Sequence, residues 1–479
     1  MLAVQEFWGK EKNFTMEKKQ NHFSGQLGFV LAAAGSAVGV GNLWRFPYLA
    51  AKDGGGLFLI IYFILVLTFG FTLLTSDIAI GRRTHKSAIG AYEQMRPKWK
   101  GLGILTFLVP VLIMTYYAVI GGWITKYAVV YVSGQASAAA ADDYFTSFIT
   151  SPVSPVVFAL LFMGVTALIV YNGVQNGIEK VSRWMMPVLL VLVVVIACYS
   201  LTLSHTNADG QVVTGWQGFL YYLTPNLEGL TVQRFLQILL DAMSQLFFSL
   251  SVSMGIMITY GSYVHPEVDL NRAVNQIEIF DTGVAFLAGM MIIPAVYVFS
   301  GTEGMGAGPS LMFISLPMVF DSMKFGTVIG AVFFLLVLFA ALTSSIALME
   351  TLASVIMDKF KLKRIPATLI IIAVCLVVGM LSCLGYGPWE SVTIIGMQFL
   401  DFFDFISNSV LMPIVAVLTC VLIGHVVGTK VVADEVKSGA GSFRREKLHR
   451  VMIRWIAPVL LVAILASELA SKIFGVFSI

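Results

Sequence analysis

Two short stretches of the chain carry oxygen-bearing groups in the middle of long apolar segments, where they suit the binding of ions. The first reads Gly-Ser-Ala-Val-Gly-Val-Gly-Asn over residues 35–42, and the second reads Phe-Ser-Leu-Ser-Val-Ser-Met-Gly over residues 248–255. Glycine is a poor helix former, because each interior glycine costs up to about 1 kcal/mol relative to alanine. Where a helix unwinds, its carbonyl oxygens are free to hold a cation and its amide groups to hold a carboxylate.

A second interpretation of residues 35–42 is a packing face, because glycine and alanine let neighbouring helices approach closely. The stretch at 248–255 favours unwinding instead, since it takes the corresponding position in the second half of the chain. Paired interruptions in two inverted halves indicate a transport site at the middle of a membrane. Backbone exposed at that depth survives only around a polar cavity, so we expect both stretches to line one.

The elements that carry these stretches are predicted to be transmembrane helices. Hydrophobic residues make up 58% of the 479 residues and charged residues only 12%, whereas soluble proteins have about 45–50% and about 25%. We therefore predict an all-α polytopic membrane protein with eleven transmembrane helices, of which the first and sixth are broken at mid-membrane. The predicted spans are residues 24–51, 57–80, 103–132, 153–171, 182–203, 232–262, 276–300, 325–357, 365–385, 391–424 and 451–475.

The distribution of lysine and arginine predicts the orientation of these spans. With eleven spans, 23 of the 30 basic residues fall in the N-terminus and in the loops on its side. By the positive-inside rule that side is cytoplasmic, so the C-terminus is predicted to lie outside the cell membrane. The predicted parts are a cytoplasmic segment 1–23, a first repeat 24–203, an extracellular loop 204–231, a second, inverted repeat 232–424, a cytoplasmic loop 425–450 and a last helix with the external C-terminus 451–479.

Composition and motifs exclude several classes of protein. The four cysteines lie in apolar runs, which disfavours loop disulfides and a zinc framework. No HExxH, GxxxxGK[ST] or GxSxG motif occurs, so neither an enzyme nor an ATP-driven pump is expected, and nothing indicates nucleic-acid binding. The charge run Lys437–Arg450 is expected to lie in water or on anionic headgroups.

Several separated motifs resemble those of the neurotransmitter:sodium symporters. The run from Gly39 to Pro47, Gly-Val-Gly-Asn-Leu-Trp-Arg-Phe-Pro, is followed by three glycines at 54–56 and is similar to the first-helix signature of that family. The other matching motifs are Tyr116-Tyr117 with Trp123, Gln245-Leu-Phe-Phe-Ser249 and Leu342-Thr343-Ser344-Ser345. The eleven spans resemble a bacterial, leucine-transporter-like branch. The resemblance implies a 5+5 inverted repeat and Na⁺-driven uptake by alternating access.

The resemblance also implies two sodium sites, both made of the oxygen ligands that hard cations prefer. The first site would consist of Ala37, Asn42, Ser249, Asp281 and the substrate carboxylate. The second site would consist of Gly35, Val38, Ala340, Thr343 and Ser344. The alternative for the hydroxyls of Thr343, Ser344 and Ser345 is that they bond back to their own helix.

For the substrate, the resemblance implies an α-amino acid. Its predicted binding residues are Ala37, Gly41, Ile113, Tyr117, Phe248, Ser249, Ser251, Met254, Ser344 and Leu348. Monoamine carriers of the family have an aspartate where this chain has Gly39, and its absence favours a substrate that brings its own carboxylate. The predicted pocket is apolar and carries no compensating charge, so it suits a neutral, hydrophobic side chain.

The resemblance assigns gates on both sides of the pocket. Arg45 and Asp404 would form the outer gate, with Phe248 as an aromatic lid. An arginine near mid-bilayer costs from about 2.5 kcal/mol upward unless it meets water or a carboxylate, and snorkelling is the alternative for Arg45. Tyr263 and Asp358 match the inner gate.

The inner gate departs from the family at two positions. Gln20 stands where relatives have the arginine that pairs with the aspartate, and Phe23 replaces a tryptophan. Lys18 or Lys19 is then the candidate partner of Asp358.

Chloride is not expected to be required. In chloride-dependent relatives the anion would lie near Tyr62, Gln245, Ser249, Asp281 and Ala285. Many chloride-independent members have a glutamate at the position of Ala285, and Asp281 can supply that charge one turn earlier on the same helix face. The alternative is a protonated Asp281 that behaves like asparagine, which a neighbouring sodium ion opposes.

Two other functions remain open on the same fold. A proton-coupled or exchange carrier is disfavoured by the paired sodium-site residues, because proton-coupled relatives tend to have a lysine near the second site. An amino-acid sensor that binds without transport differs from a carrier only in counterflow. The expected partners are a small amino acid and membrane lipid, and the oligomeric state is open.

Overall fold

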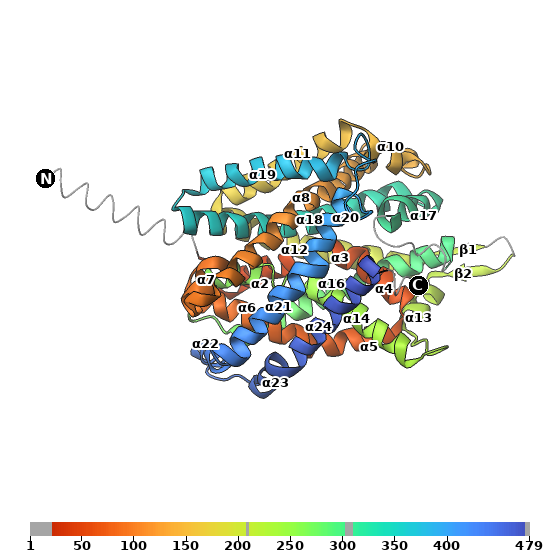
Figure 1. Cartoon of the computed structure of the whole chain (residues 1–479). Coiled ribbons are helices and arrows are strands. Elements are labelled where there is room, and N and C mark those ends of the chain that lie inside the picture. Colours follow the sequence, from red (N-terminus) through yellow and green to blue (C-terminus); the bar gives the residue numbers. More distant parts are fainter. Residues whose placement is uncertain (1–21, 207–209, 302–309, 475–479) are drawn as a thin grey trace.

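The computed structural model describes residues 22–206, 210–301 and 310–474. Helices dominate these residues, and the β structure is one antiparallel hairpin of β1 (Ser204–Thr206) and β2 (Val212–Thr214). In Figure 1 the helices lie side by side, with the hairpin at the right-hand end of the molecule. The helices α13 (Gly215–Leu223) and α17 (Leu316–Ser322) lie at this hairpin end, whereas α7 (Ala88–Met95) and α22 (Lys430–Ala440) lie at the other.

Nine helical segments of the described residues are long and apolar enough to cross a membrane. They are Gly56–Thr84, Pro97–Val132, Ser154–Tyr171, Val174–Leu201, Leu270–Ser300, Gly326–Phe360, Arg364–Leu384, Phe399–Val426 and Glu446–Ala470. The two other predicted spans, 24–51 and 232–262, are both divided into shorter helices. The chain is therefore a helical, polytopic membrane protein in which two of the predicted spans are interrupted.

Both interruptions fall where the sequence predicts them. The first span consists of α2 (Gln26–Ala37), α3 (Val40–Leu43) and α4 (Arg45–Lys52), and the sixth consists of α14 (Val232–Ser249) and α15 (Ile256–Ser262). Between α14 and α15 the backbone alternates into the left-handed region at Ser251 (φ 52°), Ser253 (φ 62°) and Gly255 (φ 76°). Serine is uncommon in that region, so the surrounding contacts must hold this segment in place.

Two long helices form the centre of the molecule. α8 (Lys100–Val132) and α18 (Gly326–Phe360) pack along each other, and α11 (Ser154–Tyr171) and α19 (Arg364–Leu384) lie beside them (Figure 1). On their other side lie α12 (Lys180–Leu201), which follows the π-helical turn η3 (Val174–Glu179), and α16 (Leu270–Ser300), which packs on the first span. The second span comprises α5 (Gly56–Leu65), the π-helical turn η1 (Val66–Gly70) and α6 (Phe71–Thr84).

The last two spans are assembled from short pieces. The first comprises α20 (Phe399–Asp404), η6 (Phe405–Leu411), α21 (Met412–Val421) and η7 (Leu422–Val426). The second comprises α23 (Glu446–Val451), η8 (Met452–Ile456) and α24 (Ala457–Phe474), which packs along α21. The remaining short elements are η2 (Pro97–Trp99), α9 (Ala136–Ala139), α10 (Tyr144–Thr150) and η5 (Leu311–Ser315).

The predicted span 391–424 begins too early. Its first helix starts at Phe399, and residues 385–398 form turns in which Ile395 (φ 53°) and Gly396 (φ 74°) are left-handed. A backbone reversal at Ile394–Met397, closed by a two-way hydrogen bond, prevents the helix from starting earlier. Val392 and Ile395 in this loop are apolar, so the sequence pattern placed the start of the span before the helix begins.

Candidate functional site

The two interrupted spans meet α8 and α18 around one cavity. All ten residues predicted to bind substrate line it, together with five that were not predicted for that role: Ser36, Gly39, Val40, Asn42 and Ile256. The cavity has an empty volume of about 370 Å³. Its apolar walls come from Ile113 of α8, Leu348 of α18 and Met254 of the unwound segment, and none of its lining residues is ionisable apart from Tyr117.

Three of the residues predicted for the first sodium site are hydrogen-bonded to one another beside this cavity. The Nδ2 of Asn42 donates to Oδ1 of Asp281 (2.8 Å) and to Oγ of Ser249 (2.9 Å). The Ser249 hydroxyl in turn lies 2.9 Å from Oδ1 and 3.1 Å from Oδ2 of Asp281. Asp281 is fully buried, and Ala37 lies at the end of α2 on the wall of the same cavity.

The amide of Asn42 has a defined direction in this cluster. Its Oδ1 accepts a hydrogen bond from the backbone N–H of Gly39 (3.1 Å), so its nitrogen faces Asp281. A cation on Asp281 needs the oxygen of that amide instead, which a rotation of the amide group by about half a turn supplies.

The far side of the cavity offers a free hydroxyl. The Tyr117 OH is buried and has no hydrogen-bond partner among the described residues. A Cβ at Gly39 would lie 3.6 Å from that oxygen and 3.0 Å from Oγ of Ser344. A side chain at position 39 would therefore occupy the cavity in front of Tyr117, whereas glycine leaves that volume to a ligand.

The unwound segment of the sixth span is held by contacts that the sequence analysis missed. The carbonyl of Ser36 accepts hydrogen bonds from the hydroxyls of Ser251 (3.0 Å) and Ser344 (3.1 Å). Asp77 of α6, which is 2% exposed, accepts the backbone N–H of Ser253 at 2.9 Å. A carboxylate inside an apolar span is costly and is therefore a signal of function, which would have identified Asp77.

The residues predicted for the second sodium site are close together but do not form a comparable cluster. A Cβ at Gly35 of α2 would lie 3.2 Å from Cβ of Thr343, so α2 and α18 touch at this point. The Thr343 hydroxyl donates to Phe339 O (3.0 Å) and Ala340 O (3.1 Å) within its own helix. This is the back-bonded alternative, and it still leaves the oxygen lone pairs of Thr343 available to a cation. Val38 follows α2 in an extended conformation (ψ 90°).

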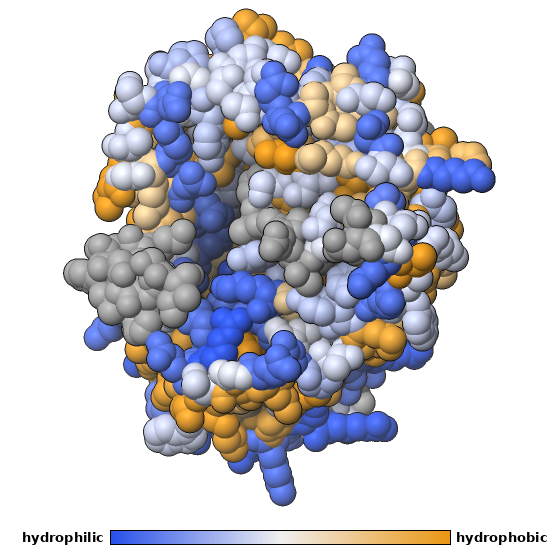
Figure 2. Space-filling view, turned by 90° about the vertical axis from the view of Figure 1, so that its right-hand side faces the viewer, coloured by the Kyte–Doolittle hydropathy of each residue, from blue (hydrophilic) through white to orange (hydrophobic). Residues whose placement is uncertain are grey.

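At the hairpin end, a hollow of about 1,480 Å³ leads towards the cavity. Figure 2 shows this end of the molecule, with hydrophilic residues around a hollow left of its centre. Arg45, Asp404 and Phe248 all line the hollow, together with Asp401. Arg45 donates to Oγ of Ser244 (2.9 Å), and no ion pair joins Arg45 to Asp404 in the described part of the chain.

A carboxyl pair lies beyond the hollow, formed by Asp53 in the loop after the first span and Asp241 of α14. Asp53 is fully buried after α4 and accepts a hydrogen bond from Arg234 at 3.0 Å, while Asp241 meets Lys52 at 3.5 Å. Burial and, secondly, the neighbouring Asp241 raise the pKa of Asp53 from 3.8 to about 7.

At the opposite end, the two residues predicted for the inner gate do not contact each other. The Tyr263 hydroxyl donates to Glu350 (2.8 Å), whose carboxylate is fully buried and also paired with Arg364. Glu350 lies two helical turns after Thr343 on α18, and this intramembrane carboxylate was the missed signal. Tyr263 and Arg364 line an open hollow of about 1,650 Å³.

Asp358 lines the same hollow, where its partners among the described residues are Ser87, Lys86 and Lys361. It accepts the hydroxyl of Ser87 (2.9 Å) and lies 3.7 Å and 3.6 Å from the amino groups of Lys86 and Lys361. Lys18, Lys19 and Gln20 lie outside the described residues. Phe23, in the position of the family tryptophan, packs edge-on against Tyr260 with ring centroids 5.5 Å apart.

The predicted chloride neighbourhood contains unpaired polar atoms. The Tyr62 hydroxyl and Oε1 of Gln245 are buried without hydrogen-bond partners among the described residues. Nε2 of Gln245 donates to Gly41 O at 3.3 Å. Ala285 is fully buried on α16, four residues after Asp281, so at the position of Ala285 itself this chain has no carboxylate, and Asp281 lies one turn earlier.

Comparisons with known proteins give one family. The sequence profile of the Sodium:neurotransmitter symporter family matches residues 20–147 and 149–474. The uncharacterized sodium-dependent transporter YhdH of Bacillus subtilis is 35% identical over 433 residues, covering 89% of this chain and 92% of the relative. The sodium- and chloride-dependent GABA transporter 2 of Homo sapiens is 25% identical, covering 90% of this chain and 77% of its own. The crystal structure of MhsT in complex with L-phenylalanine superposes with a TM-score of 0.82 at 34% identity, covering 94% and 99% of the two chains.

Proposed function

The chain belongs to the sodium:neurotransmitter symporter family, and from this premise we propose that it imports neutral, hydrophobic L-amino acids with Na⁺ and without chloride. As a member it is a multi-pass membrane protein and a Na⁺-coupled symporter of a small molecule, and the family is one of transporters. The proposal adds the substrate class, two sodium sites and the orientation in which the hairpin end faces outside. It counts the two interrupted segments as spans, which gives eleven spans in two inverted repeats of five and a final helix.

The observation that carries the proposal is the contact of Asn42, Ser249 and Asp281 beside a cavity with an unpaired tyrosine hydroxyl. In the proposed bound state Na⁺ lies between the Asp281 carboxylate, the Ser249 hydroxyl, the rotated Asn42 amide and the Ala37 carbonyl. The carboxylate of the amino acid completes this shell and accepts the Tyr117 hydroxyl. Because one ligand of the ion belongs to the substrate, each of the two raises the affinity for the other.

The shape and chemistry of the cavity support the substrate class. Gly39 leaves the volume before Tyr117 to a carboxylate, and the opposite wall of Ile113, Met254 and Leu348 offers only apolar contact to the side chain. A charged side chain there would be desolvated without a partner, which is costly. MhsT, whose structure is similar over 94% of this chain, was solved in complex with L-phenylalanine.

Chloride independence follows in this account from the position of Asp281. A carboxylate at that point balances Na⁺ and leaves no need for a mobile anion, although Tyr62 and Gln245 could each face one. The human relative named chloride-dependent is 25% identical to this chain, so the two can differ at this point.

Alternating access requires that the cavity open to one side at a time. We assign the outer closure to Arg45, Asp404 and Phe248, which line the hollow at the hairpin end. The inner closure uses Tyr263, with Asp358 and the buried Glu350–Arg364 pair on the same side. Two Na⁺ moving inward with a zwitterion carry two charges, worth about 4.6 kcal/mol per 100 mV, so uptake is expected to be electrogenic.

The test is a thermal-stability screen of the purified protein against the twenty amino acids, in sodium gluconate and in potassium gluconate. Neutral hydrophobic L-amino acids are expected to raise the melting temperature only in sodium, since the substrate carboxylate is itself a ligand of the ion. Counterflow in liposomes then distinguishes a carrier from a sensor. Equal stabilisation in potassium, or a preference for charged amino acids, would contradict the proposal.

A further inference from the structure

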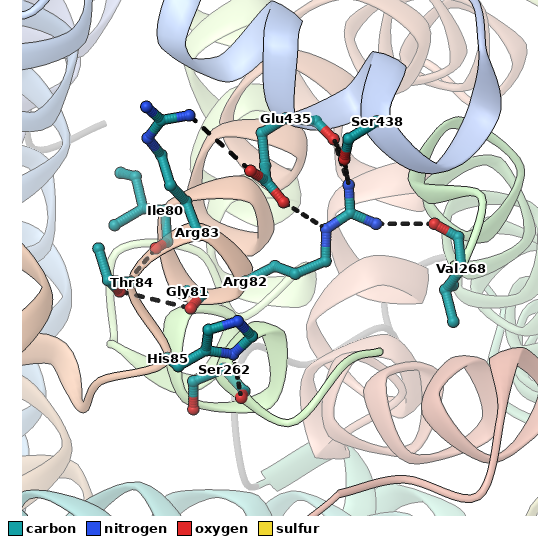
Figure 3. A network of polar contacts seen from close by, with 10 residues as sticks. All are labelled: Ile80, Gly81, Arg82, Arg83, Thr84, His85, Ser262, Val268, Glu435 and Ser438. Atoms are coloured by element: carbon teal, nitrogen blue, oxygen red, sulfur yellow. Dashed lines mark hydrogen bonds and ion pairs between the residues drawn. The ribbon is translucent and has the colours of Figure 1, made fainter. Parts of the chain in front are cut away.

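The segment between the last two spans is fastened to helices distant in sequence. Its helix α22 packs on α6 and α16, and Arg445, within the charge run Lys437–Arg450 that was expected to lie in water or on headgroups, is 24% exposed. Figure 3 shows the first attachment, at Arg82 near the end of α6. Arg82 is 1% exposed and donates to Glu435 (2.6 Å), to Val268 O (2.7 Å) and to Ser438 (3.2 Å).

The second attachment is made by an arginine from the middle of the charge run. The guanidinium of Arg445 lies 3.4 Å from the centre of the Phe71 ring, at the start of α6. It donates to the Leu67 carbonyl in the π-helical turn η1 at 3.0 Å. On the other side it contacts Asn275 and lies 3.3 Å from the carboxylate of Glu278, both on α16. Arg445 therefore joins the second span to α16.

Of the joined elements, α16 carries a ligand of the first sodium site, because Asp281 lies three residues after Glu278. Tyr62, on the helix α5 that precedes η1, belongs to the predicted chloride neighbourhood, which also includes Asp281. Glu278 is 2% exposed, and its second oxygen, Oε1, has no hydrogen-bond partner among the described residues. Arg445 thus supplies the positive charge that this buried carboxylate needs, one helical turn from the residue proposed to bind Na⁺.

We propose that Arg445 is a positioning residue for the first sodium site. It fixes the spacing between η1–α6 and α16, and through α16 it sets where the Asp281 carboxylate lies relative to Asn42 and Ser249. This inference rests on the proposed function, because it assumes that Asp281 binds Na⁺. It adds that Na⁺ affinity depends on a residue in the loop between the last two spans.

The chain offers matched controls for this role. Arg444, the exposed neighbour of Arg445, carries the same charge in the same loop and forms no hydrogen bond with α6 or α16 within the described part of the chain. Arg445→Lys keeps the charge but cannot stack on Phe71 while donating in a plane to both Leu67 and Glu278. Glu278→Gln removes the buried charge, so the double variant Arg445→Gln/Glu278→Gln separates charge compensation from positioning.

The experiment measures the Na⁺ concentration for half-maximal L-phenylalanine binding by the purified full chain, with the melting temperature as the second readout. Arg445→Gln is expected to raise this concentration by about fivefold, Arg445→Lys by about twofold and Arg444→Gln not at all. At saturating Na⁺ the affinity for L-phenylalanine is expected to stay within about twofold, since the substrate cavity is untouched.

The double variant gives the decisive result, and it also carries the test if Arg445→Gln alone fails to fold. Positioning predicts that the double variant recovers the melting temperature and still needs about fivefold more Na⁺. If the double variant recovered both the melting temperature and the wild-type Na⁺ requirement, or if every Arg445 variant kept the wild-type Na⁺ requirement, the inference would be overturned. A wild-type protein that binds L-phenylalanine without Na⁺ would instead contradict the proposed function itself.

Discussion

The two predicted sodium sites differ in what holds their ligands in place. At the first site Asn42, Ser249 and Asp281 come from three separate elements and bond to one another around a buried carboxylate. At the second site the predicted ligands are carbonyls and hydroxyls, and Thr343 donates its hydroxyl proton to its own helix.

The difference between the two sites follows from the presence of a charged group at the first site. A buried carboxylate must be satisfied by donors, so it draws side chains from different helices into one cluster. Neutral hydroxyls can hydrogen-bond to the backbone of their own helix, so they do not need side chains from other helices. We therefore expect the first site to depend strongly on one residue and the second to share its energy among several weak ligands.

The largest effect is expected from removing the carboxylate. Asp281→Ala leaves Na⁺ without its one charged protein ligand, so the Na⁺ requirement for L-phenylalanine binding is expected to rise about 100-fold or more, about 3 kcal/mol. Equilibrium binding across a Na⁺ titration measures it. A shift of less than about tenfold would mean that the first site is no more dependent on a single residue than the second.

A smaller effect is expected at the second site. Thr343→Val keeps the shape but removes one neutral ligand, which is expected to raise the Na⁺ requirement by about tenfold, or about 1.4 kcal/mol. Thr343→Ser is the matched control, because it keeps the hydroxyl. If the valine variant behaved like the wild type in a Na⁺ titration, the Thr343 hydroxyl would bond only within α18 and would not be a ligand of Na⁺.

The substrate end of the cavity can be changed without touching either ion site. Met254→Phe adds a ring to the wall opposite Tyr117, so the ranking of amino acids is expected to shift towards smaller side chains by about tenfold in relative affinity. The Na⁺ requirement for the preferred substrate is expected to stay the same. Competition binding with L-phenylalanine and L-alanine measures the shift. An unchanged ranking would mean that Met254 does not contact the side chain of the substrate.

The smallest effect concerns pH and lies outside both sites. Because the pKa of Asp53 is about 7 in the folded chain and 3.8 without the fold, the unfolded chain ionises first and stability falls as pH rises between these values. Asp53→Asn removes this dependence, so its melting temperature relative to the wild type is expected to be higher at pH 8 than at pH 5. If the melting temperatures of Asp53→Asn and the wild type differed by the same amount at pH 5 and pH 8, the raised pKa of Asp53 would be contradicted.

The sequence predicted the features that depend on short stretches of residues, and it missed those that depend on contacts between distant helices. Glycine and serine inside apolar spans predicted both interruptions, and the family motifs predicted ten of the fifteen residues that line the cavity, because these signals are contained in short stretches. The attachment of Arg445 to Glu278 and Leu67 depends on how distant helices pack, so the charge run alone indicated a solvated loop. The contacts of Asp358 with Ser87 and Lys86 were not predicted for the same reason. Glu350 and Asp77 were missed although a carboxylate in an apolar span is itself a signal.

The role of Asp281 as the built-in anion is tested most directly by L-phenylalanine binding to the wild type and to Asp281→Asn in sodium gluconate and in sodium chloride. If Asp281 is the built-in anion, the wild type binds equally in both salts. The Asp281→Asn variant then binds weakly in gluconate and is partly restored by chloride, which takes the place of the missing charge beside Tyr62 and Gln245. A wild type that requires chloride, or a variant indifferent to it in every buffer, would contradict the account.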